Sequence, residues 1–259
     1  MKKLYLLPLL LCCVMLTPAH AQEKWTEVGI YVFMMGIEGD ATTSGTLGDV
    51  TADVDVSFSD ILDNLDFTFM GFVEHRRGKW SFIGDVAYLK ISAEKTRSRT
   101  PVSSLTLDAE FEQTLGEAFV GYRVFAQNQG EAQFGIDLLV GARYNEIAFE
   151  LDATASLLGL TTSASRNPSE DWVDGVIGAR VQYGHNNGWG VSALADVCDG
   201  SDSSSYQLMG IVSYRFKNNI RVFGGYRLYN LEYTGDTGGR RFDVDLDYTG
   251  PMFGVSYRF

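Results

Sequence analysis

The last seven residues of the chain alternate strictly between apolar and small or polar side chains. The apolar set is Phe253, Val255, Tyr257 and Phe259, and the set between them is Gly254, Ser256 and Arg258. A period of two means a β-strand with two different faces, and a membrane-spanning barrel has lipid on one face and a polar lumen on the other. A soluble sheet can show the same alternation, so this strand needs support from the rest of the chain.

The same alternation recurs inside the chain, with the larger apolar side chains on one face. The apolar sets are Phe134, Ile136, Leu138, Val140, Ala142 and Tyr144; Val173, Ile177, Ala179, Val181 and Tyr183; and Tyr206, Leu208, Val212, Tyr214 and Phe216. Aromatic residues gather near the ends of such segments, as the interfacial girdles of membrane barrels require: Trp80, Tyr122, Tyr144, Tyr183, Trp189, Tyr214 and Tyr257. A soluble, lipocalin-like barrel would instead place polar residues outside.

Ten segments with strand character predict an all-β fold, a closed antiparallel transmembrane β-barrel of about ten strands. They are 25–38, 66–76, 79–94, 106–125, 132–150, 171–184, 188–199, 205–217, 220–234 and 244–259. Short polar turns at 76–78, 126–131, 185–188 and 217–219 alternate with longer links at 39–65, 95–105, 151–170, 200–204 and 235–243. This asymmetry predicts short periplasmic turns and longer extracellular loops. Eight or twelve strands remain open, because the first segment is apolar on both faces and 106–116 alternates poorly.

Residues 1–21 have the features of a cleaved secretory signal, with two lysines, a short apolar core and Ala19-His20-Ala21 before the cleavage point. The remaining 22–259 then form one barrel domain. Cleavage removes Cys12 and Cys13 and leaves Cys198 alone, so an intrachain disulfide is not expected. Cleavage also removes two lysines and no acid, which moves the formal charge from −12 to −14 and argues against a nucleic-acid partner.

Three motifs carry a resemblance to a known class: Ser59 to Phe67 (SDILDNLDF), Gly225 to Leu231 (GYRLYNL) and Gly250-Pro251 to Phe259. With them the chain resembles the small monomeric outer-membrane β-barrel proteins of Gram-negative bacteria, the class that includes the OmpA transmembrane domain, OmpX and OmpW. The resemblance covers nearly all of 22–259 and implies a barrel in the outer membrane. It implies location and fold, and hardly any activity.

Charged residues of both signs fall on the expected inward face. The expected lumen network is Asp85, Glu117, Arg123, Asp137, Arg143, Asp174, Arg180, Asp196, Arg215 and Arg227, with Arg258 beside it. An isolated charge in a narrow lumen is costly, so pairing is expected. Two readings follow: a lumen filled by cross-linked Arg–carboxylate pairs, or a charged constriction that selects small solutes.

Catalysis is not expected. His20 lies in the signal, while His75 and His185 lie at or beside periplasmic turns, away from the outer rim where a surface hydrolase would act. No nucleophile-elbow, zinc-protease or phosphate-loop motif occurs in the sequence, so neither a catalytic site nor a cofactor or metal site is assigned.

The first long link, 39–65, carries six aspartates and no basic residue, and Asp53-x-Asp55 offers oxygens to a divalent cation without full EF-hand spacing. Ser59 is the expected N-cap of a short helix through Ile61 and Leu62 that could act as a lid. The link 95–105 is basic and would meet lipopolysaccharide phosphates.

The sequence therefore predicts an integral outer-membrane barrel, structural or surface-interacting, with a filled lumen. The alternative is a narrow porin-like channel, and a surface hydrolase is less favoured. The expected partners are lipopolysaccharide and outer-membrane lipid, a divalent cation at the acidic link, and the barrel-assembly machinery, which would read Phe253, Val255, Tyr257 and Phe259.

Overall fold

The computed structural model describes residues 24–45, 48–100, 103–157, 160–166, 169–236 and 241–259. The expected signal peptide lies outside these residues. The described strands and the helix are β1 (Lys24–Phe33), β2 (Gly36–Gly45), β3 (Gly48–Val56), α1 (Phe58–Asp63), β4 (Leu65–Arg77), β5 (Trp80–Thr100), β6 (Ser103–Gln129), β7 (Ala132–Leu157), β8 (Leu160–Arg166), β9 (Ser169–His185), β10 (Trp189–Asp199), β11 (Ser203–Arg215), β12 (Ile220–Asp236) and β13 (Arg241–Arg258).

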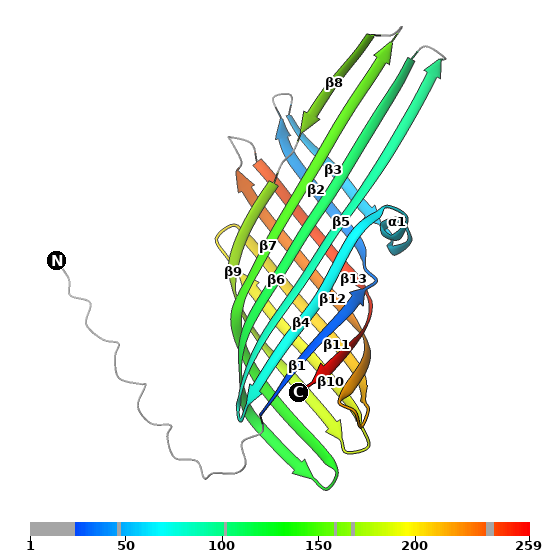
Figure 1. Ribbon diagram of the computed structural model, residues 1–259. Helices are drawn as coiled ribbons and strands as arrows, with labels where there is room; N and C mark the ends of the chain where they lie inside the picture. Colours follow the sequence, from blue (N-terminus) through cyan, green and yellow to red (C-terminus); the bar gives the residue numbers. More distant parts are fainter. Residues whose placement is uncertain (1–23, 46–47, 101–102, 158–159, 167–168, 237–240) are drawn as a thin grey trace, which may run out of the picture.

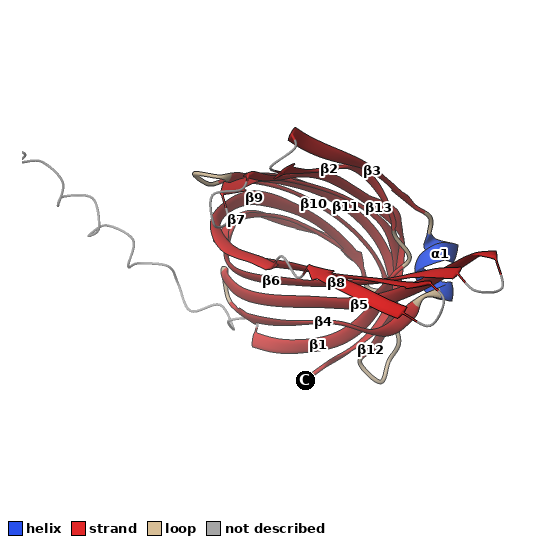
Figure 2. Cartoon of the chain, turned by 90° about the horizontal axis from the view of Figure 1, so that it is seen from above, coloured by secondary structure: helices blue, strands red, loops and turns tan. Residues whose placement is uncertain are grey.

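Ten strands close into an antiparallel barrel. They follow the order β1-β4-β5-β6-β7-β9-β10-β11-β12-β13, and β13 pairs back onto β1 with Val28 opposite Tyr257. Figure 2 shows the ring from above, with the C-terminal strand beside β1. The predicted ten-stranded barrel is confirmed. Each of the ten wall strands pairs with two neighbours. No strand therefore exposes a full row of unpaired backbone N–H and C=O groups to lipid.

The wall continues past one rim as long projections, and the tallest contains the outer parts of β5, β6 and β7 together with β8 (Figure 1). β2 prolongs β1 and pairs with β13 and β3, β8 pairs with the outer half of β7, and β5 and β6 run on together to Thr100 and Ser103. The predictions of loops at 39–65, 95–105 and 151–170 were therefore wrong over most of their length. The link 200–204 is also shorter than expected, because only three residues separate β10 from β11.

The opposite rim carries the tight turns that the sequence predicts. Gly78, Gly130 and Gly188 have φ values of 60°, 60° and 98°, and Asn219 has 66°. These left-handed conformations suit glycine and asparagine, which explains their place between long strands. The first and last described residues, Lys24 and Phe259, lie at the same rim as the tight turns, so in an outer membrane this rim would face the periplasm.

An apolar belt surrounds the half of the barrel next to the tight turns. The predicted outward residues are exposed, for example Val140 of β7 at 57% and Ile177 of β9 at 63%. Asp137, which lies on the inward face of β7, is fully buried. Trp80 packs on Tyr122 and Trp189 on Tyr214 at the lower edge of this belt, with ring centroids 4.8 and 5.3 Å apart. An apolar exterior around a polar interior is the arrangement of a membrane-spanning barrel.

Above the belt the two faces of the wall exchange character. On β13, Asp245 and Asp247 are exposed on the outer face, while Val244, Leu246 and Tyr248 are buried on the inner face. The inward residues join one apolar cluster with others from β1, β2, β4, β5, β6, β7 and β12. The upper half therefore follows the rule of a soluble sheet. A search for membrane strands does not recognise this pattern, which explains why most of β2 and all of β3 are expected as a loop.

Helix α1 joins β3 to β4 outside the ring (Figures 1 and 2). Its N-cap is Ser57 and not the predicted Ser59, because Asp60 completes a capping box by accepting the Ser57 backbone N–H at 3.1 Å. The same contacts hold the pKa of Asp60 below its ordinary value. Ile61 is buried in the apolar cluster, which anchors the helix to the wall.

The wall has a seam below α1. β1 and β4 pair only as far as Ile30 opposite Gly71, after which β1 stays with β13 and β4 stays with β5. Close packing on the β13 side explains the Gly250-Pro251 motif: Met34 N–H donates to the Pro251 carbonyl at 2.9 Å, and a Cβ on Gly250 would lie 2.2 Å from the Met34 carbonyl oxygen. Among the described residues, no helix is long and apolar enough to cross a membrane.

Candidate functional site

The interior holds three stacked groups of side chains, beginning at the rim of tight turns. There Glu27 of β1 is surrounded by three arginines from across the closure: Arg215 at 2.7 Å, Arg221 at 2.8 Å and Arg258 at 2.9 Å. Ser256 also donates to Glu27, at 2.7 Å. One carboxylate therefore holds three guanidinium groups and ties β1 to β11, β12 and β13.

A second cluster lies deeper and centres on Asp137 of β7. Arg76 and Arg180 donate to the Asp137 carboxylate at 2.6 and 3.0 Å, and Arg123 completes the set with a short contact. Arg180 also forms a two-pronged pair with Glu74 at 2.7 and 2.9 Å. Since β4 and β9 lie on opposite sides of the ring, the Arg180–Glu74 pair crosses the lumen.

The third cluster lies at mid-height around Arg143, which is fully buried. Its guanidinium donates to Glu117 at 2.5 Å, to Asp196 at 2.6 Å and to the Ser205 hydroxyl at 2.8 Å. It also lies over the ring of Tyr229, 5.1 Å from the centroid. A buried guanidinium with two carboxylates and a hydroxyl is well satisfied, so this cluster is a plug of polar side chains.

The apolar cluster closes the barrel above the charges. Trp172 of β9 stacks on Tyr233 of β12 with centroids 4.2 Å apart, and Phe149 of β7 meets Phe242 of β13 at 6.3 Å. β7 and β13 stand opposite each other in the ring, so the Phe149–Phe242 contact spans the barrel. Direct contact across the diameter leaves no room for an open water column at this level.

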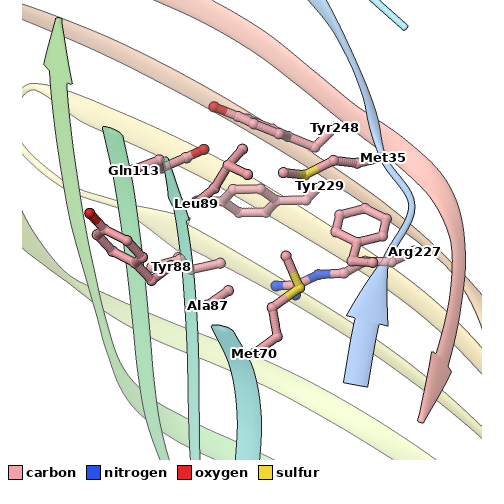
Figure 3. Close-up of a pocket in the computed structure, with 11 residues that line it drawn as sticks. Met35, Met70, Ala87, Tyr88, Leu89, Gln113, Arg227, Tyr229 and Tyr248 are labelled. Atoms are coloured by element: carbon pink, nitrogen blue, oxygen red, sulfur yellow. The ribbon is translucent and has the colours of Figure 1, made fainter. Parts of the chain in front are cut away.

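One small cleft remains within the apolar cluster, beside the seam (Figure 3). Its volume is about 30 Å³, which corresponds to about two water molecules. Gln113, Arg227 and three tyrosines, Tyr88, Tyr229 and Tyr248, line it, and the rest of the lining is methionine, leucine, phenylalanine and alanine. The interior is therefore nearly close-packed at this height.

A larger cavity of about 570 Å³ opens at the rim of tight turns. We call it the vestibule, and Glu27, Glu74, Arg76, Arg123, Arg215, Lys217, Arg221 and Arg258 line it. Two acids thus face five arginines and one lysine. The Arg258 guanidinium stacks 3.8 Å from the centroid of the Trp25 ring, which fixes it at the edge of the vestibule.

Eight of the ten residues expected in the lumen network lie in these clusters: Glu117, Arg123, Asp137, Arg143, Arg180, Asp196, Arg215 and Arg227. Two have other partners. Asp85 accepts the Tyr31 hydroxyl at 2.7 Å, and Asp174 accepts the Ser203 hydroxyl at 2.6 Å.

Sequence reasoning missed Glu27, Glu74, Arg76 and Arg221. Arg76 was assigned to a turn with Arg77 and Gly78, and that was wrong, because β4 continues through Arg77 and points Arg76 inward at 2% exposure. Glu74 lies two residues before Arg76, and side chains two apart share a face, so this spacing was the available signal.

The histidines lie where the sequence places them among the described residues, at the rim of tight turns. His75 shares a hydrogen bond with Thr26 at 2.9 Å, and His185 lies 3.8 Å from Glu131. Cys198 is a free, buried thiol on β10.

The acidic first link forms a block of carboxylates on the outer face of β13, β2 and β3. Strand register places Asp40 between Asp53 and Asp245, and Glu38 between Asp55 and Asp247. We call these six residues the acidic face. No group of three or more histidine, cysteine or acidic side chains in the described part of the chain is arranged to hold a metal ion. The basic side chains Lys95, Arg97 and Arg99 lie outside the residues whose side chains are described.

Comparison with known proteins supports the fold. No family model matches the sequence, and no curated protein is similar to it. Among solved structures the chain is similar to the outer-membrane protease OmpT from Escherichia coli, with a TM-score of 0.51 and 9% identity over 94% of this chain and 99% of that chain. The attachment invasion locus protein Ail of Yersinia pestis gives a TM-score of 0.32 and 13% identity over 92% of this chain and 99% of that chain. Neisserial surface protein A gives a TM-score of 0.27 and 13% identity over 93% of this chain and 100% of that chain. The chain is a closed ten-stranded antiparallel β-barrel, and the likeness to OmpT is a likeness of fold.

Proposed function

We propose that this protein is an integral outer-membrane barrel that does not conduct and that acts through the strands projecting above the membrane. The observation that carries the proposal is the double closure of the lumen. The Arg143 cluster fills the barrel at mid-height, and the Trp172–Tyr233 and Phe149–Phe242 contacts cross it above. A passive pore needs a continuous polar path, and packed aromatic pairs supply none.

Planar-bilayer recording tests the closure directly. The refolded barrel is expected to insert without discrete current steps, with insertion verified by heat-modifiable gel mobility. The aromatic contacts and the Arg143 cluster close the lumen in series, so replacing Trp172 and Tyr233 alone by alanine is expected to leave the barrel silent. Adding Phe149→Ala and Arg143→Ala removes the remaining contacts across the lumen, and steps or transient openings are expected only from this combined variant. The matched control is a pair of alanine substitutions on the outer face, at Leu208 and Val212, which leave the interior unchanged. Steady, ion-selective current from the unaltered protein would instead favour the narrow channel.

The acidic face supports an interaction role. Like charges directly opposite on neighbouring strands destabilise a sheet, and here Asp40 faces both Asp53 and Asp245. Asn230 relieves part of this repulsion by donating to Asp245 at 3.2 Å and Asp247 at 3.0 Å. We infer that divalent cations complete the neutralisation by bridging these carboxylates to lipopolysaccharide phosphates, which would supply the remaining oxygen ligands.

Calcium titration in bilayers that contain lipopolysaccharide tests this role. Millimolar Ca²⁺ is expected to raise the unfolding temperature of the unaltered protein, because a ligand of the folded state stabilises it. A variant with Asp53, Asp55, Asp245 and Asp247 all changed to asparagine should be more stable without calcium and should lose the response. Asp199→Asn, on the opposite side of the barrel, is the control. An equal calcium response in both variants would contradict the proposal.

An enzymatic role has less support, although one similar fold belongs to a protease. His75 and His185 lie at the periplasmic rim, and Cys198 is buried in the wall. None of these lies near the projecting strands, where a surface substrate would arrive. We therefore propose no catalytic residue. If the protein showed hydrolytic turnover and His185→Ala abolished it, this conclusion would be wrong.

A further inference from the structure

The vestibule carries an excess of positive charge that the barrel itself does not neutralise. Among the described residues, the two clusters nearest the tight turns contain three carboxylates, Glu27, Glu74 and Asp137, against six guanidinium groups. The whole chain is acidic, with a formal charge of −12. Positive charge is thus concentrated in this cavity while the protein as a whole repels anions.

The carboxylates have little capacity left for these arginines. On Glu27, one oxygen accepts from Arg221 and Ser256 and the other from Arg215 and Arg258. Each guanidinium carries five N–H donors, so three of them around one carboxylate offer far more donors than it can accept. Unmatched donors and unbalanced charge both point to a missing acceptor that is negatively charged.

The vestibule has the size and shape for such a ligand. Its volume of about 570 Å³ falls within the range of small-molecule sites. Arg76 and Arg123 of the Asp137 cluster form part of its lining, and residues of the tight turns, among them Asn187, Lys217 and Asn219, form another part. The planar fork of arginine matches phosphate and carboxylate groups in two-pronged pairs, and positive charge in a cleft raises the local concentration of anions.

We propose that the vestibule is a binding site for a small polyvalent oxyanion, one that carries two or more phosphate or carboxylate groups. Arg215, Arg221 and Arg258 bind it at the mouth, with Trp25 holding Arg258 in position. The ligand reaches the site from the side of the tight turns and does not cross the barrel. This site goes beyond the proposed surface role and does not depend on it, because the acidic face lies at the opposite end of the wall.

Calorimetric titration of the refolded barrel in neutral detergent micelles tests the proposal. Sodium pyrophosphate and sodium citrate are the probes, and the two together show whether phosphate or carboxylate is preferred. The expected result is saturable binding of at least one probe at a single site, with affinity that falls as sodium chloride rises. Absence of saturable binding of both probes at low salt would overturn the proposal.

The decisive variant replaces both Arg215 and Arg258 by glutamine. It leaves Glu27 paired with Arg221 alone, so the local charge is balanced and folding is expected to survive. Affinity for the preferred probe should fall at least tenfold, while Lys90→Gln on the outer face should leave it unchanged. Unchanged affinity in the double variant would overturn the proposal. If that variant fails to fold, phosphorus NMR of pyrophosphate with the unaltered barrel decides: line broadening that citrate reverses supports the site, and its absence overturns it.

Discussion

Asp137→Asn is expected to destabilise the barrel by about 3–5 kcal/mol, the range measured when one partner of a buried ion pair is removed. The Asp137 carboxylate is fully buried and accepts from Arg76, Arg123 and Arg180. The asparagine amide keeps the shape but loses the charge, and its NH₂ group faces donors. Arg76 and Arg180 would then share Glu74, and Arg123 would keep only the Gln182 amide oxygen, in a medium that screens the repulsion of the three guanidinium groups poorly.

Urea unfolding in liposomes, followed by tryptophan fluorescence, measures this change as a lower midpoint. Asp245→Asn, on the exposed acidic face, is the matched control and should lie within about 0.5 kcal/mol of the unaltered protein. Adding Arg123→Gln to Asp137→Asn should restore part of the loss, because it removes one unpaired charge. An unchanged midpoint in Asp137→Asn would show that water solvates this cluster.

Ile177→Arg is expected to be the most damaging change on the outer face. Ile177 is 63% exposed near the middle of the apolar belt on β9. Arginine at the midplane of a membrane barrel costs about 2–4 kcal/mol, because its charge must stay near lipid tails. The expected result is a lower folded fraction in liposomes, read as the heat-modifiable band on gels.

The contrast lies above the belt. Thr234→Arg on β12 also places arginine on the exposed outer face, but opposite Asp243 in the part of the wall where the outer residues are polar. Its effect should be close to zero, since water surrounds it before and after the substitution. Equal losses for both variants would mean that the boundary of the belt lies higher than the exposed residues indicate.

The sequence predicts the lower half of the fold well because one physical rule governs it. Lipid outside and charge inside give an alternation that Leu138, Val140 and Val173 follow, and all three are exposed on the wall. Ten strands and four tight turns follow from that pattern. The same rule fails above the belt in β3, where Asp53 and Asp55 are exposed while Val54 and Val56 pack against the apolar cluster, so a real strand there looks like a loop.

The interior could be predicted only as a set of charges. Arg180 and Glu74 are 106 residues apart in the chain, and only closure of the ring brings them within 2.7 Å. Three other features likewise depend on strand stagger: the seam, the point where β13 changes its partner from β1 to β2, and the apolar contacts across the lumen. A single sequence carries no direct signal of stagger, because the alternation within a strand is the same whatever its position along the barrel axis relative to its neighbours.

The outward apolar stretch also fixes the thickness of membrane that suits this barrel. From Phe134 to Tyr144 the belt covers about ten residue steps, which at about 3.4 Å each and a tilt of about 40° correspond to about 26 Å. That height is below the roughly 30 Å of an average hydrocarbon core and fits the thinner bacterial outer membrane. In a thicker bilayer the surrounding lipid would have to compress, and hydrophobic mismatch would favour clustering of neighbouring barrels or their sorting into thinner regions.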